Sequence, residues 1–324
     1  MSLRTLYQTL SNATRHPGDW EHAFRAVFHP DVQINVVHPI NDVAGIDAFL
    51  KRFLTPLMTS FSNLYRRDDI VMVGAFDGQD WVSSTGYWVG QFDHPWLGIQ
   101  PTGQLTYLRY GEFHRVADGV IVESYIFLDI PELMISVGQW PIMDSPGLHR
   151  GHTGMIHGPA SQDGVMWQDQ DAAESAKSYQ IVTDMLAGLA THDEAWRPYW
   201  RDNMMWYGPA AFGSFVGIDA FASFQVPFEG AFEGWSGGSA GNGMTQHFTR
   251  YGDGMYTCSG GWPSLTGVQI KPFLDQPATH KRVFMRVCDW WRREDDLLVE
   301  NWVFVDIPHV LTQLGYDVFK EIRT

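Results

Sequence analysis

The apolar and polar positions of the first half predict helices followed by long strands. Apolar residues at helical spacing predict helices over 3–14, 20–28 and 46–53, and alternation predicts a strand over 32–37. Long strand-like runs then cover roughly 64–76, 81–92 and 104–116. The hairpin signal Asp118-Gly119 leads into a further strand at 120–128. Helices that precede a run of antiparallel strands indicate the α+β class.

The second half repeats this pattern. Helices are predicted over 172–189, 196–200 and 218–224, and strands near 203–207, 245–251, 255–266, 282–292 and 297–305. The stretch Glu123-Ser-Tyr-Ile-Phe-Leu-Asp129 returns as Glu300-Asn-Trp-Val-Phe-Val-Asp306, at an offset of 300 − 123 = 177. Gly45-Ile-Asp-Ala-Phe returns at Gly217, at 217 − 45 = 172. The nearly equal offsets predict two copies of one domain, at 1–138 and 170–324, joined by a linker at 139–169.

Composition narrows the class of partner. The net charge of −15 and the pI near 5.2 argue against nucleic acid and anionic membrane surfaces, since neither attracts an acidic protein. Hydrophobic residues make up 44% and aromatic residues 14%, enough for a core and a ring-lined cavity in each half. Two cysteines, no signal-peptide pattern and no apolar run of roughly 18 residues lead us to expect a cytoplasmic protein.

Two segments leave their role open. The linker holds His149, His152 and His157, but no acid or cysteine completes a ligand pattern, so we expect no metal. The glycine-rich stretch 230–243 is either a mobile loop at a pocket mouth or a plain connection. Phosphate-binding and dinucleotide-binding glycine motifs are absent, so an enzyme of this sequence is expected to work without a cofactor.

Two strings resemble one family. Glu112-Phe-His-Arg, the Asp118-Gly119 turn and Glu123-x-Tyr-x-x-x-Asp129 are similar to the C-terminal signature of the SnoaL-like polyketide cyclases. The second copy, with Asp289-Trp-Trp-Arg and Glu300-x-Trp-x-x-x-Asp306, fits as well or better. This family belongs to the nuclear transport factor 2-like superfamily, whose curved antiparallel sheet is closed by helices into a cone. The resemblance implies two such cones as a tandem pseudo-dimer, but this fold hosts many functions.

The resemblance also implies a site. Alternation puts Tyr110, Glu112 and His114 on one strand face, and Tyr125, Phe127 and Asp129 on one face of the next strand. If both faces are concave, the side chains share a pocket in which a desolvated carboxylate would act as acid or base. We therefore expect catalytic roles for Asp129, His38, Glu112 and His114, and substrate contacts from Tyr110, Tyr125 and Phe127.

Some of these residues have an equally plain structural reading. Asp129 precedes Ile-Pro-Glu132, which also suits a helix N-cap with a capping box. His38-Pro39 stands where ketosteroid isomerase-like relatives carry an Asp-Pro base, but it also suits a histidine on the rim. Arg109 and Arg286 fall on the opposite face and are expected to pair with acids between domains or chains.

The two copies predict different roles. In the second half we expect Asp289, Trp291, Trp302 and Asp306 to contact a ligand, while chemistry is assigned to the first half. The predicted function is cofactor-independent acid/base chemistry on an apolar carbonyl compound, of the cyclase, isomerase or dehydratase type. The alternative is a binding protein that holds a hydrophobic ligand without turnover. Large side chains such as Phe113 and Trp290 lead us to expect that the two sheets pair, and a homo-oligomer stays open.

Overall fold

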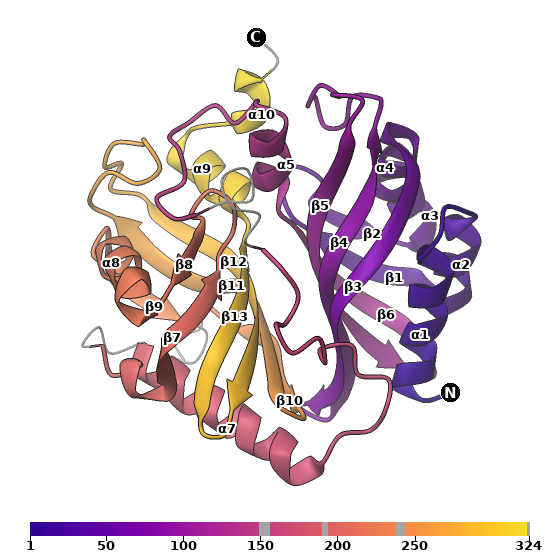
Figure 1. Cartoon of the computed structure of the whole chain (residues 1–324). Helices are drawn as coiled ribbons and strands as arrows, with labels where there is room; N and C mark the ends of the chain where they lie inside the picture. The colour runs from indigo at the N-terminus through magenta and orange to yellow at the C-terminus, as the bar shows by residue number, and fades with distance from the viewer. Residues whose placement is uncertain (149–155, 190–193, 238–243, 323–324) are drawn as a thin grey trace. The chain divides into compact units, whose positions relative to one another are not determined.

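The computed structural model describes residues 1–148, 156–189, 194–237 and 244–322 (Figure 1). The chain forms two compact units. Unit 1 comprises 1–140 with 158–169 and the C-terminal residues from Phe319, and unit 2 comprises 141–157 with 170–318. Of the predicted linker 139–169, residues 139–140 and 158–169 belong to unit 1 and residues 141–157 to unit 2. No helix in the described part of the chain is long and apolar enough to cross a membrane.

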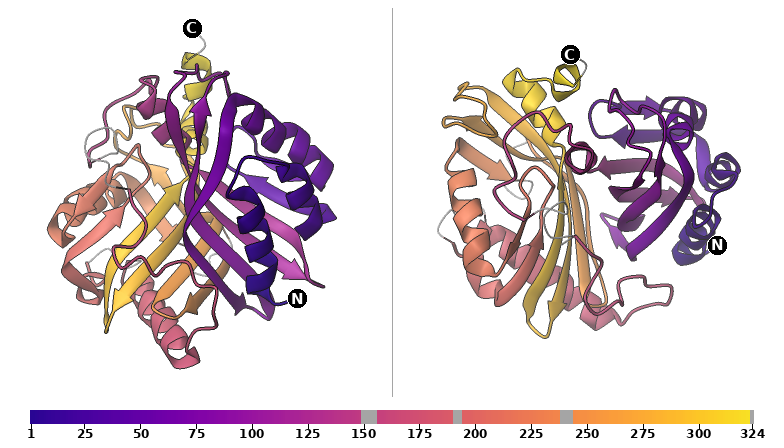
Figure 2. Two further views of the ribbon diagram at one scale, coloured as in Figure 1. Left: turned by 45° about the vertical axis from the view of Figure 1, so that its right-hand side comes forward. Right: turned by 45° about the horizontal axis from the view of Figure 1, so that its top comes forward.

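Unit 1 is a mixed sheet with helices on one side (Figure 2). Its helices are α1 (Leu3–Thr14), α2 (Trp20–Val27), α3 (Ile46–Phe49), α4 (Thr55–Ser60) and α5 (Ile130–Ser136). Its strands are β1 (Phe28–Val36), β2 (Asp42–Ala44), β3 (Phe61–Phe76), β4 (Gln79–Phe92), β5 (Leu105–Ala117) and β6 (Val120–Leu128). A π-helical turn, Leu50–Leu54, joins α3 to α4. The strand order is β2-β1-β6-β5-β4-β3.

Unit 2 is built from the same parts. Its helices are α7 (Ala172–Leu189), α8 (Ile218–Glu229), α9 (Ile307–Leu314) and the start of α10 (Val318–Glu321). Its strands are β7 (Trp200–Tyr207), β8 (Ser214–Val216), β9 (Phe232–Gly237), β10 (His247–Asp253), β11 (Tyr256–Gln269), β12 (Arg282–Glu294) and β13 (Leu297–Val305). A 3-10 turn, Arg197–Tyr199, precedes β7. The order β8-β7-β13-β12-β11-β10 matches that of unit 1, with β9 also paired to β11.

The register confirms the internal repeat. Glu112 on β5 pairs with Ile126, and Asp289 on β12 pairs with Val303. Both members of the pair are offset by the same amount, since 289 − 112 = 177 and 303 − 126 = 177. The α+β class predicted from the sequence is therefore correct, and the two units repeat one sheet topology and register.

Two features of the sheets differ from the expected ones. The sheets are mixed, because β1 runs parallel to β6 and β7 runs parallel to β13. These strands are far apart in the chain, so no hairpin forces an antiparallel pairing. In addition, the long edge strand β3 of unit 1 is replaced in unit 2 by two strands, β9 and β10. Strand β9 lies within the glycine-rich stretch, of which residues 238–243 lie outside the described part of the chain.

Two large side chains that were expected to pair the sheets are buried, as are both cysteines. Phe113 and Trp290 are each 0% exposed. Pairing of the two sheets through them remains a prediction. Cys258 and Cys288 are both buried, and no disulfide joins them.

Candidate functional site

A β-bulge in each C-terminal hairpin decides which side chains face the interior of the sheet. Next to the Asp118-Gly119 turn, Val116 pairs with Ile121, but Arg115 pairs with Glu123, so Val122 is an extra residue. Without it, Glu112 would lie opposite Tyr125; with it, Glu112 lies opposite Ile126. One extra residue moves every later side chain to the other face of the strand. Unit 2 carries the same bulge at Val299.

The bulge makes the expected first-half site wrong in its geometry. Tyr125 and Phe127 pair with Phe113 and Gly111, so they lie on the face opposite to Glu112. The Tyr125 hydroxyl donates a hydrogen bond to Glu123 Oε1 over 2.9 Å. Burial, followed by the neighbouring Glu123 charge, raises the pKa of Tyr125.

Asp129 lies away from Glu112 and caps a helix. Its Oδ1 accepts the Glu132 amide at the start of α5 over 3.1 Å, and its Oδ2 lies 3.8 Å from Arg109 Nη1. Arg109 thus has an ion-pair partner within its own unit. The capping box is only half formed, because Glu132 Oε1 accepts from the Tyr87 hydroxyl instead.

Unit 2 repeats this arrangement at two of the residues that were expected to contact a ligand, Asp306 and Trp302. Asp306 Oδ1 accepts the His309 amide over 3.2 Å, and its Oδ2 accepts from Arg286 Nη1 over 3.1 Å. Trp302 pairs with Trp290 across the sheet and donates from Nε1 to the His157 carbonyl over 2.6 Å. Asp306 and Trp302 therefore belong to the face opposite to Asp289.

The interior of unit 1 holds a compensated ion-pair network. Arg66 Nη2 donates to Glu112 Oε1 over 2.6 Å, and the Tyr7 hydroxyl donates to the same oxygen over 2.5 Å. Arg66 Nε also donates to Asp68 Oδ1 over 2.7 Å. Burial alone would raise the pKa of Glu112, but Arg66 and His114 outweigh it and the pKa lies below its ordinary value. Glu112 is therefore held as a carboxylate.

The other two expected interior residues join this network. His114 Nε2 lies 3.0 Å from Glu112 Oε1, and His114 Nδ1 lies 2.8 Å from Ser124 Oγ. The Tyr110 hydroxyl donates to Asp68, and burial raises its pKa well above the ordinary value. Glu112, His114 and Tyr110 thus belong to one network: Glu112 contacts His114 and Arg66, and Tyr110 contacts Arg66 and Asp68.

His38 lies in the turn after β1. It is half-buried, and its ring centroid lies 5.7 Å from that of Phe319. Asn41 Nδ2 lies 3.4 Å from His38 Nδ1. The structure does not bring His38 together with Glu112.

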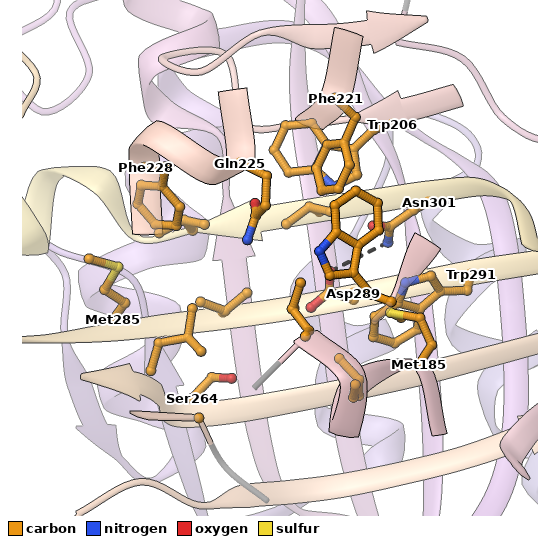
Figure 3. A pocket seen from close by; sticks show the side chains of 18 of the residues that line it. Met185, Trp206, Phe221, Gln225, Phe228, Ser264, Met285, Asp289, Trp291 and Asn301 are labelled. Atoms are coloured by element: carbon orange, nitrogen blue, oxygen red, sulfur yellow. Dashed lines mark hydrogen bonds between the residues drawn. The ribbon is translucent and has the colours of Figure 1, made fainter. Parts of the chain in front are cut away.

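A cavity of about 140 Å³ lies in unit 2, between the sheet and the helices α7 and α8 (Figure 3). Its walls are mostly aromatic and aliphatic, with Asp289, Asn301, Gln225, His247 and Ser264 as polar members. Trp291 lines it as expected, beside rings that sequence reasoning did not single out: Trp196, Trp200, Trp206, Phe212, Phe221, Phe224, Phe228 and Trp235. These rings come from separate segments, so only the fold gathers them.

Asp289 is the counterpart of Glu112 in unit 2, but its surroundings raise its pKa, whereas those of Glu112 lower the pKa of that residue. It lies on the cavity wall, where its Oδ1 accepts from Asn301 Nδ2 over 3.4 Å. Among the described residues, none forms an ion pair with it. Burial raises the pKa of Asp289 to about 7, while Asn301 and the more distant charge of Arg250 act in the opposite direction. A carboxyl in this state exchanges a proton readily at neutral pH.

His247 lies on the same cavity and is uncharged. Burial, with a smaller effect of Arg250, lowers its pKa to about 3. Nothing in the sequence distinguished this histidine, because the strand β10 was predicted two residues early and its bulged pairing with β11 is not visible in the sequence.

One part of the chain is similar to a known family. Residues 4–135, less than half of the chain, match the family model described as SnoaL-like polyketide cyclase. The strand order and register of unit 2 repeat those of unit 1. A comparison with curated proteins gave no match.

Similar solved structures each cover less than half of this chain. TsrD from Streptomyces laurentii is 20% identical, with a TM-score of 0.37, over 45% of this chain and 98% of its own. IdmH from Streptomyces antibioticus, described as a candidate polyketide cyclase, is 19% identical, with a TM-score of 0.35, over 42% and 99%. A ketosteroid isomerase-like protein from Catenulispora acidiphila is 13% identical, with a TM-score of 0.34, over 43% and 95%.

No group of three or more metal-ligating side chains is found in the described ranges. His149 and His152 lie outside those ranges.

Proposed function

We propose that the cavity of unit 2 is an acid/base site for a small apolar carbonyl compound, with Asp289 as the proton-transfer group. The observation that carries this proposal is the state of Asp289, which is half-buried on a mainly apolar cavity wall and has a pKa of about 7. General acid/base groups are most effective when their pKa lies near the working pH. The SnoaL-like match of unit 1 and the internal repeat support a reaction of the cyclase or isomerase type.

The proposed reaction needs only groups of this chain. The Asp289 carboxylate takes a proton from the carbon next to a carbonyl, the C–H electron pair forms a C=C bond, and the carbonyl becomes an enolate. If a further C=C bond is conjugated with the enolate, protonated Asp289 can return the proton to the far end of the conjugated system, which shifts the double bond. Otherwise the enolate carbon attacks a second carbonyl of the same molecule. In the second case the protonated Asp289 returns its proton to the new alkoxide, which closes the cycle.

The cavity size limits the substrate class. An apolar cavity of about 150 Å³ holds a benzene molecule. The cavity of unit 2, at about 140 Å³, therefore suits one ring with a short carbonyl side chain better than a molecule of several fused rings. The aromatic walls favour a planar ligand.

Unit 1 is proposed to have a structural role. Glu112 occupies the place of Asp289, but Arg66 and Tyr7 compensate its charge. A carboxylate with a lowered pKa is a weak base at neutral pH. This reverses the expectation that the first half performs the chemistry.

A binding protein without turnover is the second candidate, because a cavity with mainly apolar walls also suits simple retention of a ligand. Proton exchange separates the two. Phenylacetone in D₂O exchanges the hydrogens next to its carbonyl, and ¹H NMR follows the loss of their signals. We expect the protein to accelerate this exchange, and Asp289→Asn to reduce the acceleration by about 100-fold or more while phenylacetone still binds.

The matched control is Glu112→Gln, which removes the corresponding carboxylate of unit 1 and should leave the exchange rate within twofold. Binding of phenylacetone by the wild type without any acceleration would support the binding-protein alternative. Equal acceleration by Asp289→Asn and the wild type would exclude Asp289 as the base.

A further inference from the structure

Strand β11 leaves its regular register beside the cavity. Gly261 pairs with Val287 and Leu265 with Met285, so β11 takes four residue steps where β12 takes two. Bulges next to a site re-aim side chains. Here the bulge brings Ser264 to the cavity wall, where it is 5% exposed (Figure 3). In unit 1 the pairing of β4 with β5 continues without such a break.

The neighbouring histidine is held in one tautomer. Arg250 Nη2 lies 2.7 Å from His247 Nδ1, and a guanidinium can only donate, so Nδ1 is the acceptor. Ser259 Oγ lies 2.8 Å from the same nitrogen. A neutral imidazole has one N–H, which must then be on Nε2. That N–H donates to Ser264 Oγ over 2.9 Å.

Ser264 is left with a hydroxyl hydrogen to donate. Its oxygen accepts from His247, so its own hydrogen points elsewhere. Among the described residues, no acceptor for that hydrogen is found, and the side chain lies on the same cavity as Asp289. A buried donor without an acceptor is costly unless a bound molecule supplies one.

We propose that Ser264 donates a hydrogen bond to the carbonyl oxygen of the molecule bound in this cavity, with His247 as the positioning residue that orients it. The catalytic part of this proposal rests on the proposed acid/base function; the binding part does not. When Asp289 takes the neighbouring C–H proton, the electron pair moves onto the carbonyl oxygen, and the Ser264 hydrogen bond strengthens. The site then selects ketones or aldehydes over hydrocarbons of the same shape.

The binding test compares two ligands of one shape. Phenylacetone has a carbonyl oxygen where (2-methylprop-2-enyl)benzene has a methylene group. We expect wild-type protein to bind the ketone more tightly, and Ser264→Ala to weaken ketone binding about fivefold to tenfold while binding of the alkene changes by less than twofold. Tryptophan fluorescence reports both titrations, since Trp291, Trp206 and Trp196 line the cavity. The proposal is overturned if the wild type does not bind the ketone more tightly than the alkene. It is also overturned if Ser264→Ala weakens the binding of both ligands equally.

The matched control is Ser259→Ala. Ser259 contacts the same imidazole at Nδ1 but does not line the cavity, so ketone binding should change by less than twofold. A loss equal to that of Ser264→Ala would show that the effect passes through general damage to the strand and would overturn the assignment. For the positioning role, His247→Gln keeps an N–H donor and should retain most of the ketone preference, whereas His247→Phe should lose it. If His247→Gln and His247→Phe both lose the ketone preference, or if both keep it, the positioning role of His247 is contradicted.

The catalytic part has its own readout. Removal of one oxyanion donor typically lowers turnover by about 10²–10³. Ser264→Ala should therefore slow the exchange of phenylacetone hydrogens at saturation by about that factor. If ketone preference depends on Ser264 while Asp289→Asn exchanges at the wild-type rate, the proposed function fails and the binding proposal stands. If Asp289→Asn abolishes the exchange but Ser264→Ala keeps the wild-type ketone preference and exchange rate, the proposed function stands and the proposal for Ser264 fails.

Discussion

The state of Asp289 predicts an unusual pH dependence of stability for Asp289→Asn. An aspartate in an unfolded chain has a pKa of about 3.9, whereas Asp289 in the folded protein has a pKa of about 7. The folded state therefore binds more protons than the unfolded state between these values, so this group makes the wild type less stable as the pH rises through that window. Asparagine has nearly the same shape and can still accept from Asn301, but it does not titrate.

The magnitude follows from the two pKa values. By proton linkage, the group costs the wild type about 1.5 kcal/mol at pH 5 and about 4 kcal/mol at pH 8. The difference in free energy of unfolding, Asp289→Asn minus wild type, should therefore rise by about 2.5 kcal/mol between these pH values. Urea denaturation followed by tryptophan fluorescence at pH 5, 6, 7 and 8 measures it, because all other titrating groups are common to both proteins.

Glu112→Gln provides the control of opposite sign. The pKa of Glu112 is lowered in the folded state, so its charge stabilises the protein above its unfolded pKa and this contribution is lost as the pH falls. The Gln variant should be less stable than the wild type at pH 8, and the gap should narrow in acid. A difference for Asp289→Asn that is constant with pH, or that shrinks toward pH 8, would refute the reasoning about Asp289.

Two further predictions concern acid/base groups. Asp129→Asn keeps an N-cap but removes the buried carboxylate partner of Arg109, so urea denaturation should show a free energy of unfolding lower by about 3 kcal/mol. The folded variant should exchange phenylacetone hydrogens at the wild-type rate. A large loss of exchange would restore Asp129 as a catalytic group. The exchange rate of the wild type should rise with pH and level off above about pH 7, because Asp289 must be ionised to act as a base; a rate that is flat between pH 5 and 8 would contradict this.

The sequence by itself determined the elements, the repeat and the helix caps. Periodicity and turn residues are local properties, so α1, α7 and the hairpin at Asp118-Gly119 were predicted close to where they lie. The repeat of Asp129 as Asp306 predicted two copies of one sheet, and both residues cap a helix because the Asp-Ile-Pro sequence suits an N-terminus wherever it occurs.

Only the tertiary structure decided which residues face each interior and in which protonation state. Val122 and Val299 look like ordinary strand residues, but each is the extra residue of a bulge. The side chains that follow it in the strand therefore point to the opposite face of the sheet. Glu112 and Asp289 are equivalent in sequence, but Arg66, 46 positions away in the chain, compensates only the first. Whether a buried carboxylate meets a cation or a ring-lined cavity depends on distant segments, and the resulting difference in desolvation and charge makes Asp289 rather than Glu112 the candidate base.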